Sequence, residues 1–117
     1  MLTDEVRYRL MRLVAARPEM SQRELARELG NSLGKLNFCL RALVGKGLIK
    51  ATNFKGSKHK AGYLYFLTPR GAEEKARITV RFLQRKLAEY ESMRIEIEEI
   101  RRDAEQHKNR SNPGLLK

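Results

Sequence analysis

The sequence predicts a mainly α-helical chain with a small β component, and three observations lead to this fold class. Two short apolar-periodic segments within residues 21–47 carry helix start and stop signals. A β-hairpin pattern with a basic tip follows over residues 48–67. From Pro69 to His107 the helical spacing then continues, interrupted only by Gly71 in the first turn.

The first helix is predicted to run from Thr3 to about Ala16. Thr3 or Asp4 can cap its start, and apolar residues recur on one face as far as Val14. Arg17 precedes a proline, and a residue in that position is pushed out of the helical region. The helix is therefore expected to stop there.

The next two helices are separated by a very short turn. Ser21 and Glu24 form the pattern of a capping box, and Gly30 supplies a residue that can end the helix with positive φ. A third helix is predicted to begin at Asn31–Ser32 and to end at residues 45–47. Two helices joined by a short turn that contains glycine are typical of a helix-turn-helix.

A hairpin and a long helix complete the chain. Residues 48–54 and 62–67 are predicted strands joined by the polar loop 55–61, and Thr68–Pro69 is a helix start signal. The order of elements predicts a winged helix-turn-helix domain. The expected divisions are residues 1–68 for a winged helix-turn-helix DNA-binding domain, 69–107 for a long dimerisation helix and 108–117 for a flexible tail.

The charge of the chain favours a polyanionic partner. It has 25 Lys and Arg against 14 Asp and Glu, a formal net charge of +11. Residues 1–60 hold 13 basic and 5 acidic residues, whereas residues 61–117 hold 12 and 9. A basic half beside a charge-mixed half indicates a nucleic-acid-binding module joined to another element, although a merely basic solvated surface is the alternative.

The third helix has a side that is free of large aliphatic residues. At 100° per residue, its apolar residues cluster on the other side: Leu33, Leu36, Leu40, Leu43 and Val44. Lys35 and Arg41 suit phosphate or guanine, and Asn37 suits adenine or phosphate. Phe38 suits a thymine methyl group, with a place in the core as the alternative. The predicted DNA-binding residues of this helix and of the hairpin tip are Ser32, Gly34, Lys35, Asn37, Phe38, Arg41, Lys55, Lys58, His59 and Lys60.

The long helix carries an apolar seam whose residues are three or four positions apart. Ile78 and Phe82 lie off this seam and are expected to pack against the first domain. A long exposed seam favours self-association, so a homodimer is predicted. A helix folded back on its own domain, or paired with another protein, is the alternative. After Ala76, the predicted dimerisation residues are Val80, Leu83, Leu87, Tyr90, Met93, Ile97, Ile100 and Ala104.

Other kinds of function have little support. No nucleophile–base pair, acid pair or phosphate-binding glycine loop indicates an enzyme, and no cofactor is expected. His59 and His107 lack partners for a metal site, and no apolar run is long enough for a membrane span. The expected compartment is the cytoplasm. Cys39 is expected beside the DNA-reading face, where it is either a small packing residue or a site of oxidation.

Residues 22–30, 33–49 and 67–71 resemble winged-helix regulators of the MarR type. With residues 79–86, the chain is similar to a short MarR-like subgroup associated with bacterial exopolysaccharide gene clusters. The resemblance implies a dimeric transcriptional regulator of those genes. MarR-type proteins usually carry a preceding helix that helps to form the dimer and a ligand pocket, whereas this chain begins at the first core helix.

The predicted partner is double-stranded DNA, bound at a pseudo-palindrome by two recognition helices roughly 34 Å apart. A winged helix that binds RNA or single strands is one alternative, and a protein-interaction module is another. The sequence leaves open the operator, the sign of regulation and any small-molecule effector.

Overall fold

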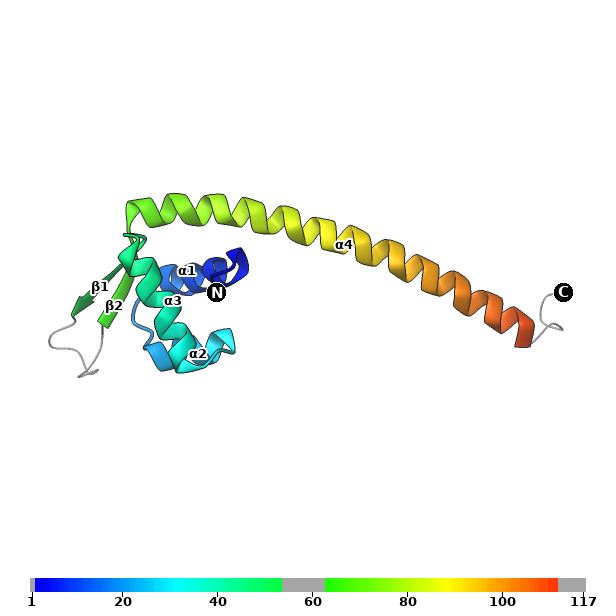
Figure 1. Ribbon diagram of the computed structural model, residues 1–117, viewed down its shortest axis with the longest axis horizontal. Helices are drawn as coiled ribbons and strands as arrows, with labels where there is room; N and C mark the ends of the chain where they lie inside the picture. Colours follow the sequence, from blue (N-terminus) through cyan, green and yellow to red (C-terminus); the bar gives the residue numbers. More distant parts are fainter. Residues whose placement is uncertain (1, 54–62, 112–117) are drawn as a thin grey trace. The chain divides into compact units, whose positions relative to one another are not determined.

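A computed structural model describes residues 2–53 and 63–111 (Figure 1). The chain forms two compact units, residues 1–82 and residues 83–117. The mainly α-helical class with a two-stranded wing and a long last helix is confirmed. The elements are α1 (Asp4–Ala16), α2 (Gln22–Leu29), α3 (Leu33–Gly45), β1 (Ile49–Asn53), β2 (Tyr63–Leu67) and α4 (Pro69–Ser111).

Short polar side chains begin the first three helices, as the sequence predicts. Thr3, Ser21 and Ser32 each accept a hydrogen bond from the backbone N–H three residues later. The distances are 3.2 Å to Val6 N, 3.2 Å to Glu24 N and 3.1 Å to Lys35 N. Gly30 ends α2 with a φ of 68°, a conformation that glycine adopts without strain.

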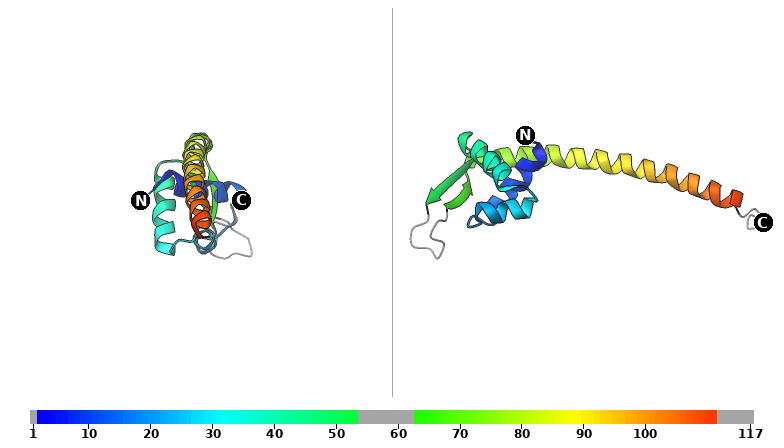
Figure 2. Two further views of the ribbon diagram at one scale, coloured as in Figure 1. Left: turned by 90° about the vertical axis from the view of Figure 1, so that its right-hand side faces the viewer. Right: turned by 60° about the horizontal axis from the view of Figure 1, so that its bottom comes forward.

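The first unit has a hydrophobic core, to which α1, α2, α3, the hairpin and the start of α4 contribute. The ribbons of these elements lie together in Figure 2. α3 supplies its inward side at the spacing of successive helical turns. The ten largest fully buried side chains are Leu10, Met11, Val14, Leu25, Leu36, Cys39, Leu40, Leu43, Ile49 and Ile78.

Three side chains of α3 differ from expectation. Cys39 is 1% exposed and packs in the core, so its interpretation as a small packing residue is confirmed and its expected place beside the DNA-reading face is wrong. Leu33 and Val44, expected on the buried side, are 43% and 37% exposed. The reason is geometric, because the side that faces α1 and α2 is centred on Leu36, Cys39, Leu40 and Leu43, and the two aliphatic residues fall at its edges.

β1 and β2 pair antiparallel, with Ile49 opposite Leu67 and Asn53 opposite Tyr63. Ile49 and Tyr65 point into the core, whereas Tyr63 and Phe66 are 50% and 39% exposed. The backbone N–H of Tyr65 donates to the carbonyl of Pro18 at 3.0 Å, which joins the wing to the segment before α2. The two predicted strands are therefore present: β1 begins at Ile49 instead of Leu48, and the predicted strand ends at residues 54 and 62 lie outside the described residues.

The start of α4 packs very closely against the segment before β1. The Thr68 hydroxyl donates to the carbonyl of Gly47 at 2.6 Å and accepts from the backbone N–H of Gly71 at 2.9 Å, so Thr68 caps the helix as predicted. A Cβ atom at Gly71 would overlap the backbone carbonyl of Leu48. This position therefore requires the absence of a side chain.

The first turns of α4 belong to the first unit, which extends to residue 82 and so beyond the expected division at residue 68. Ile78 is fully buried in the core, and the rings of Phe82 and Tyr8 lie 5.1 Å apart. Both contacts agree with the expectation that these residues pack on the first domain. Helix α4 continues to Ser111, past the predicted end at His107.

An ion-pair cluster also joins α1 to α4 within this unit. Asp4 accepts hydrogen bonds from Arg81 at 3.1 Å and from Arg7 at 2.9 Å. Arg7 lies 3.8 Å from Glu74, which in turn pairs with Arg77 at 2.9 Å. The hydrogen bond from Arg81, followed by that from Arg7, lowers the pKa of Asp4 from 3.8 to about 2.

We predict that Gly71→Ala destabilises the protein by about 1–3 kcal/mol, the usual range for forcing a methyl group into a packed site. The added Cβ must displace the Leu48 carbonyl or the start of α4. Urea unfolding followed by circular dichroism measures the change. Gly34→Ala is the control, because a Cβ there meets nothing within 4 Å. Equal stability of the two variants would contradict the close approach.

We predict that Asp4→Asn lowers the melting temperature at neutral pH. Because the folded-state pKa of Asp4 is depressed, its stabilising effect is present above the unfolded value near 3.8 and is lost as the pH falls through about 2. The difference from wild type should therefore shrink over this range. Glu91→Gln, which alters an exposed pair with Arg94, should change the melting temperature little. A difference for Asp4→Asn that persists unchanged at pH 2 would contradict this account.

Candidate nucleic-acid interface

The side of α3 that faces away from the core is hollowed into a groove of about 430 Å³. The residues that line this α3 groove are Gly34, Asn37, Phe38, Arg41 and Ala42. Phe38 is 62% exposed, so the alternative that it belongs to the core is wrong. Small residues beside an amide, a guanidinium and an exposed ring form a surface that can approach the edges of bases closely.

The predicted DNA-binding residues of the helix-turn-helix come together on this element. Four of them line the α3 groove, and Lys35 is exposed in the first turn of the same helix. Ser32 caps α3, so its oxygen is already an acceptor for the N–H of Lys35. The four predicted residues of the hairpin tip, Lys55, Lys58, His59 and Lys60, lie outside the described residues. The contacts of all these residues with DNA remain predictions.

The segment around α3 is electropositive because it lacks acidic residues altogether. Between Glu28 and Glu73 the sequence has no Asp or Glu. It has eight basic residues there: Lys35, Arg41, Lys46, Lys50, Lys55, Lys58, Lys60 and Arg70. A concentration of positive charge beside a free helix face attracts a polyanion and raises its rate of association.

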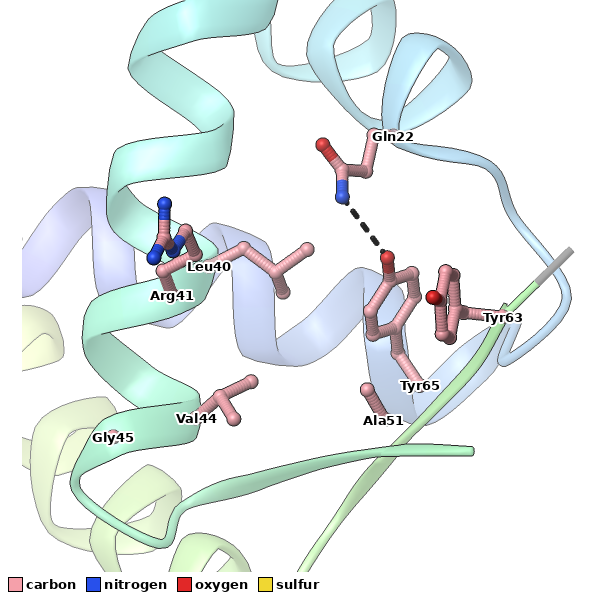
Figure 3. A pocket seen from close by; sticks show the side chains of 8 residues that line it. All are labelled: Gln22, Leu40, Arg41, Val44, Gly45, Ala51, Tyr63 and Tyr65. Carbon is pink, nitrogen blue, oxygen red and sulfur yellow. Dashed lines mark hydrogen bonds between the residues drawn. The ribbon is translucent and has the colours of Figure 1, made fainter. Parts of the chain in front are cut away.

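A second groove of about 400 Å³ lies between α3 and the wing (Figure 3). Its surface is mainly aliphatic and aromatic, and the rings of Tyr63 and Tyr65 lie 6.3 Å apart along one wall. Arg41 borders both this wing groove and the α3 groove. The residues that line the wing groove are Gln22, Leu40, Arg41, Val44, Gly45, Ala51, Tyr63 and Tyr65.

A polar bridge connects the two grooves. The Asn37 amide nitrogen donates to Gln22 Oε1 at 3.1 Å, and Gln22 Nε2 donates to the Tyr65 hydroxyl at 3.1 Å (Figure 3 shows the second bond). Sequence reasoning missed Gln22, because its partners are 15 and 43 residues away and no local pattern links them. Tyr65 is 5% exposed, so its ring belongs to the core.

Features typical of other functions are absent from the described residues. Within residues 2–53 and 63–111, no group of three or more His, Cys, Asp or Glu side chains could hold a metal ion. None of the helices in these ranges combines the length and the apolar character needed to cross a membrane. Cys39, the one cysteine of the sequence, is buried in the core.

Comparison with known proteins agrees with this geometry. Residues 3–50 match the family model described as winged helix-turn-helix DNA-binding. No curated protein sequence matches the chain. The match and the fold together define the chain as a winged helix-turn-helix protein.

Solved structures of MarR-type regulators share this fold. Wild-type MarR from E. coli in its apo form is 25% identical, with 62% of this chain and 52% of that chain covered and a TM-score of 0.53. The transcriptional repressor CouR, solved bound to a 23-mer DNA duplex, is 28% identical, with a TM-score of 0.56. The similarity covers 68% of this chain and 54% of CouR.

The PcaV transcriptional regulator from Streptomyces coelicolor is similar in fold, with 20% sequence identity and a TM-score of 0.63. The similarity covers 88% of this chain and 78% of PcaV. The chain spans about half the length of MarR and of CouR. The fold of the chain is thus that of MarR-type regulators.

Proposed function

We propose that the protein is a transcriptional regulator of the MarR type that binds double-stranded DNA in a sequence-specific way. The observation that carries this proposal is the exposed face of α3, where Asn37, Phe38 and Arg41 line one groove in a segment free of acidic residues. Such a helix fits the major groove, whose base edges differ in their donors, acceptors and methyl groups. CouR, which has a similar fold, was solved bound to a DNA duplex, and this supports duplex DNA as the proposed ligand.

The roles of the side chains follow from their chemistry. Arg41 would read guanine or hold a phosphate, and Phe38 would contact a thymine methyl group or a sugar. The lysines of the hairpin tip, which lie outside the described residues, would neutralise phosphates beside the site. An RNA ligand is less favoured, because side chains cannot enter the deep, narrow major groove of A-form RNA.

We propose that the regulator acts as a homodimer. In the second unit, residues 83–111 of α4 form a helix whose seam residues Leu83, Leu87 and Tyr90 are 55%, 56% and 66% exposed. The seam continues with Met93, Ile97 and Ile100, which are 47–59% exposed. An isolated amphipathic helix gains its stability mainly by burying such a stripe, and a second copy supplies an identical stripe.

The proposed dimer and the resemblance to the MarR-like subgroup suggest which DNA sites and which genes the protein controls. A symmetric pair of recognition helices fits a pseudo-palindromic operator. The likeness of residues 79–86 to the exopolysaccharide-associated subgroup supports genes of exopolysaccharide biosynthesis as the regulated genes. Selection of bound duplexes from a random pool gives the operator, and its occurrence upstream of such genes tests the target.

We predict that a binding assay distinguishes contacts with bases from contacts with phosphates. Arg41→Ala should change the preference among duplex sequences by about 1–3 kcal/mol at one base pair, because a base contact is lost. Lys58→Ala should weaken all duplexes similarly and reduce the salt slope by about one unit. Titrations of fluorescent duplexes at several salt concentrations measure both. Single strands and RNA of the same sequence are the competitors, and equal binding of all three ligands would refute the proposed function.

We predict that Leu87→Glu produces a monomer at micromolar concentration, because it places a charge in the seam. Ile95→Glu is the matched control: Ile95 lies off the seam of the same helix and is similarly exposed, at 48% against 56% for Leu87. Sedimentation velocity should show a dimer for the wild type and for Ile95→Glu. A monomeric wild type, or equal effects of the two substitutions, would contradict the homodimer.

A further inference from the structure

We infer that Gln22, a residue of α2 outside the base-reading surface, fixes the orientation of the Asn37 amide and so sets the base that Asn37 selects. The inference rests on the proposed function, because it concerns how the same surface reads duplex DNA. It starts from the polar bridge that links Asn37 on α3, Gln22 on α2 and Tyr65 on β2.

The orientation of an asparagine amide decides which base it can recognise. A bidentate contact with adenine uses the amide oxygen as acceptor and one N–H as donor, in a fixed order along the base edge. Turning the amide by 180° exchanges the oxygen and the nitrogen and reverses that order. An Asn37 amide free to turn would therefore discriminate poorly among bases.

Gln22 removes this freedom. In the structure Asn37 Nδ2 donates to Gln22 Oε1 at 3.1 Å, so in this arrangement the Asn37 nitrogen faces Gln22. Asn37 then keeps its oxygen and its second N–H for a ligand in the α3 groove, which it lines. One oxygen and one N–H are the two groups that adenine requires.

Gln22 is itself held from the wing side. Its Nε2 donates to the Tyr65 hydroxyl at 3.1 Å, and the Tyr65 side chain is 5% exposed and set in the core (Figure 3). Gln22 lines the wing groove and does not line the α3 groove, so it orients Asn37 from behind the surface that faces a base. It is therefore a positioning residue.

The test compares base preferences in the whole 117-residue chain. Duplexes selected from a random pool by the wild type should show a preference for adenine at one base pair that Asn37→Ala abolishes. Gln22→Ala should reduce the same preference by about tenfold, the scale of one bidentate contact, and leave the other positions unchanged. A general loosening of the fold would instead lower the preference at every position together with the melting temperature.

Gln22→Glu is the matched variant. A carboxylate only accepts hydrogen bonds, so it still receives the Asn37 N–H, and the Tyr65 hydroxyl can turn to donate to it. We expect this variant to keep the adenine preference while its negative charge weakens all duplexes similarly. Retention of the preference in Gln22→Glu and its loss in Gln22→Ala would support the positioning role.

Two sets of results would overturn the inference and leave the proposed function standing. One is a wild-type adenine preference that persists in Gln22→Ala. The other is sequence-dependent duplex binding that Asn37→Ala does not change. If the wild type binds duplexes without any sequence preference, the proposed function fails and the inference fails with it.

Discussion

Helix α3 packs against the core with only one of its sides, and the proposed activity depends on this constraint. Leu36, Cys39, Leu40 and Leu43 are at most 2% exposed, and they anchor the helix to the core formed with α1 and α2. A helix buried on one side must present its other side to solvent, since successive residues are turned by 100°. Phe38 and Arg41 are exposed for this reason. The exposed Phe38 ring is apolar surface that a bound ligand would cover.

The wing acts on this surface at two points. Arg41 borders the α3 groove and the wing groove, so a change at the hairpin can alter the environment of its guanidinium. Tyr65 holds Gln22, and Gln22 holds Asn37. Half-buried hydrogen bonds of this kind restrict side-chain rotation more than solvent-exposed ones, because competing water is largely excluded. The wing is thereby linked to the α3 groove through side chains that lie in the described part of the hairpin.

The two parts of helix α4 differ in their structural roles. Its first turns are part of the first unit, where Gly71 allows the helix to approach Leu48 and Ile78 fills the core. Asp4 and Arg81 add a polar contact between α1 and α4, 77 residues apart in sequence. In the second unit the helix carries exposed seam residues. Without a partner, this stripe would remain in water, and this exposure is the physical basis of the proposed homodimer.

The sequence by itself determined the features that depend on near neighbours. Capping residues such as Ser21 and Ser32, the positive φ of Gly30 and the helical spacing act within a few residues, so the elements and the free face of α3 were predictable. The periodic seam of α4 was visible for the same reason.

Only the tertiary structure decided which residues from distant segments meet. Cys39 proved to lie in the core, and Leu33 and Val44 at its edge, because the direction from which α1 and α2 pack is not encoded in the spacing of α3 alone. The bond from Gln22 to Tyr65 joins residues 43 positions apart. Such contacts depend on the assembled core, whereas helix caps and apolar periodicity depend on local geometry. The mainly α-helical class with its wing could therefore be predicted, and the positioning of Asn37 could not.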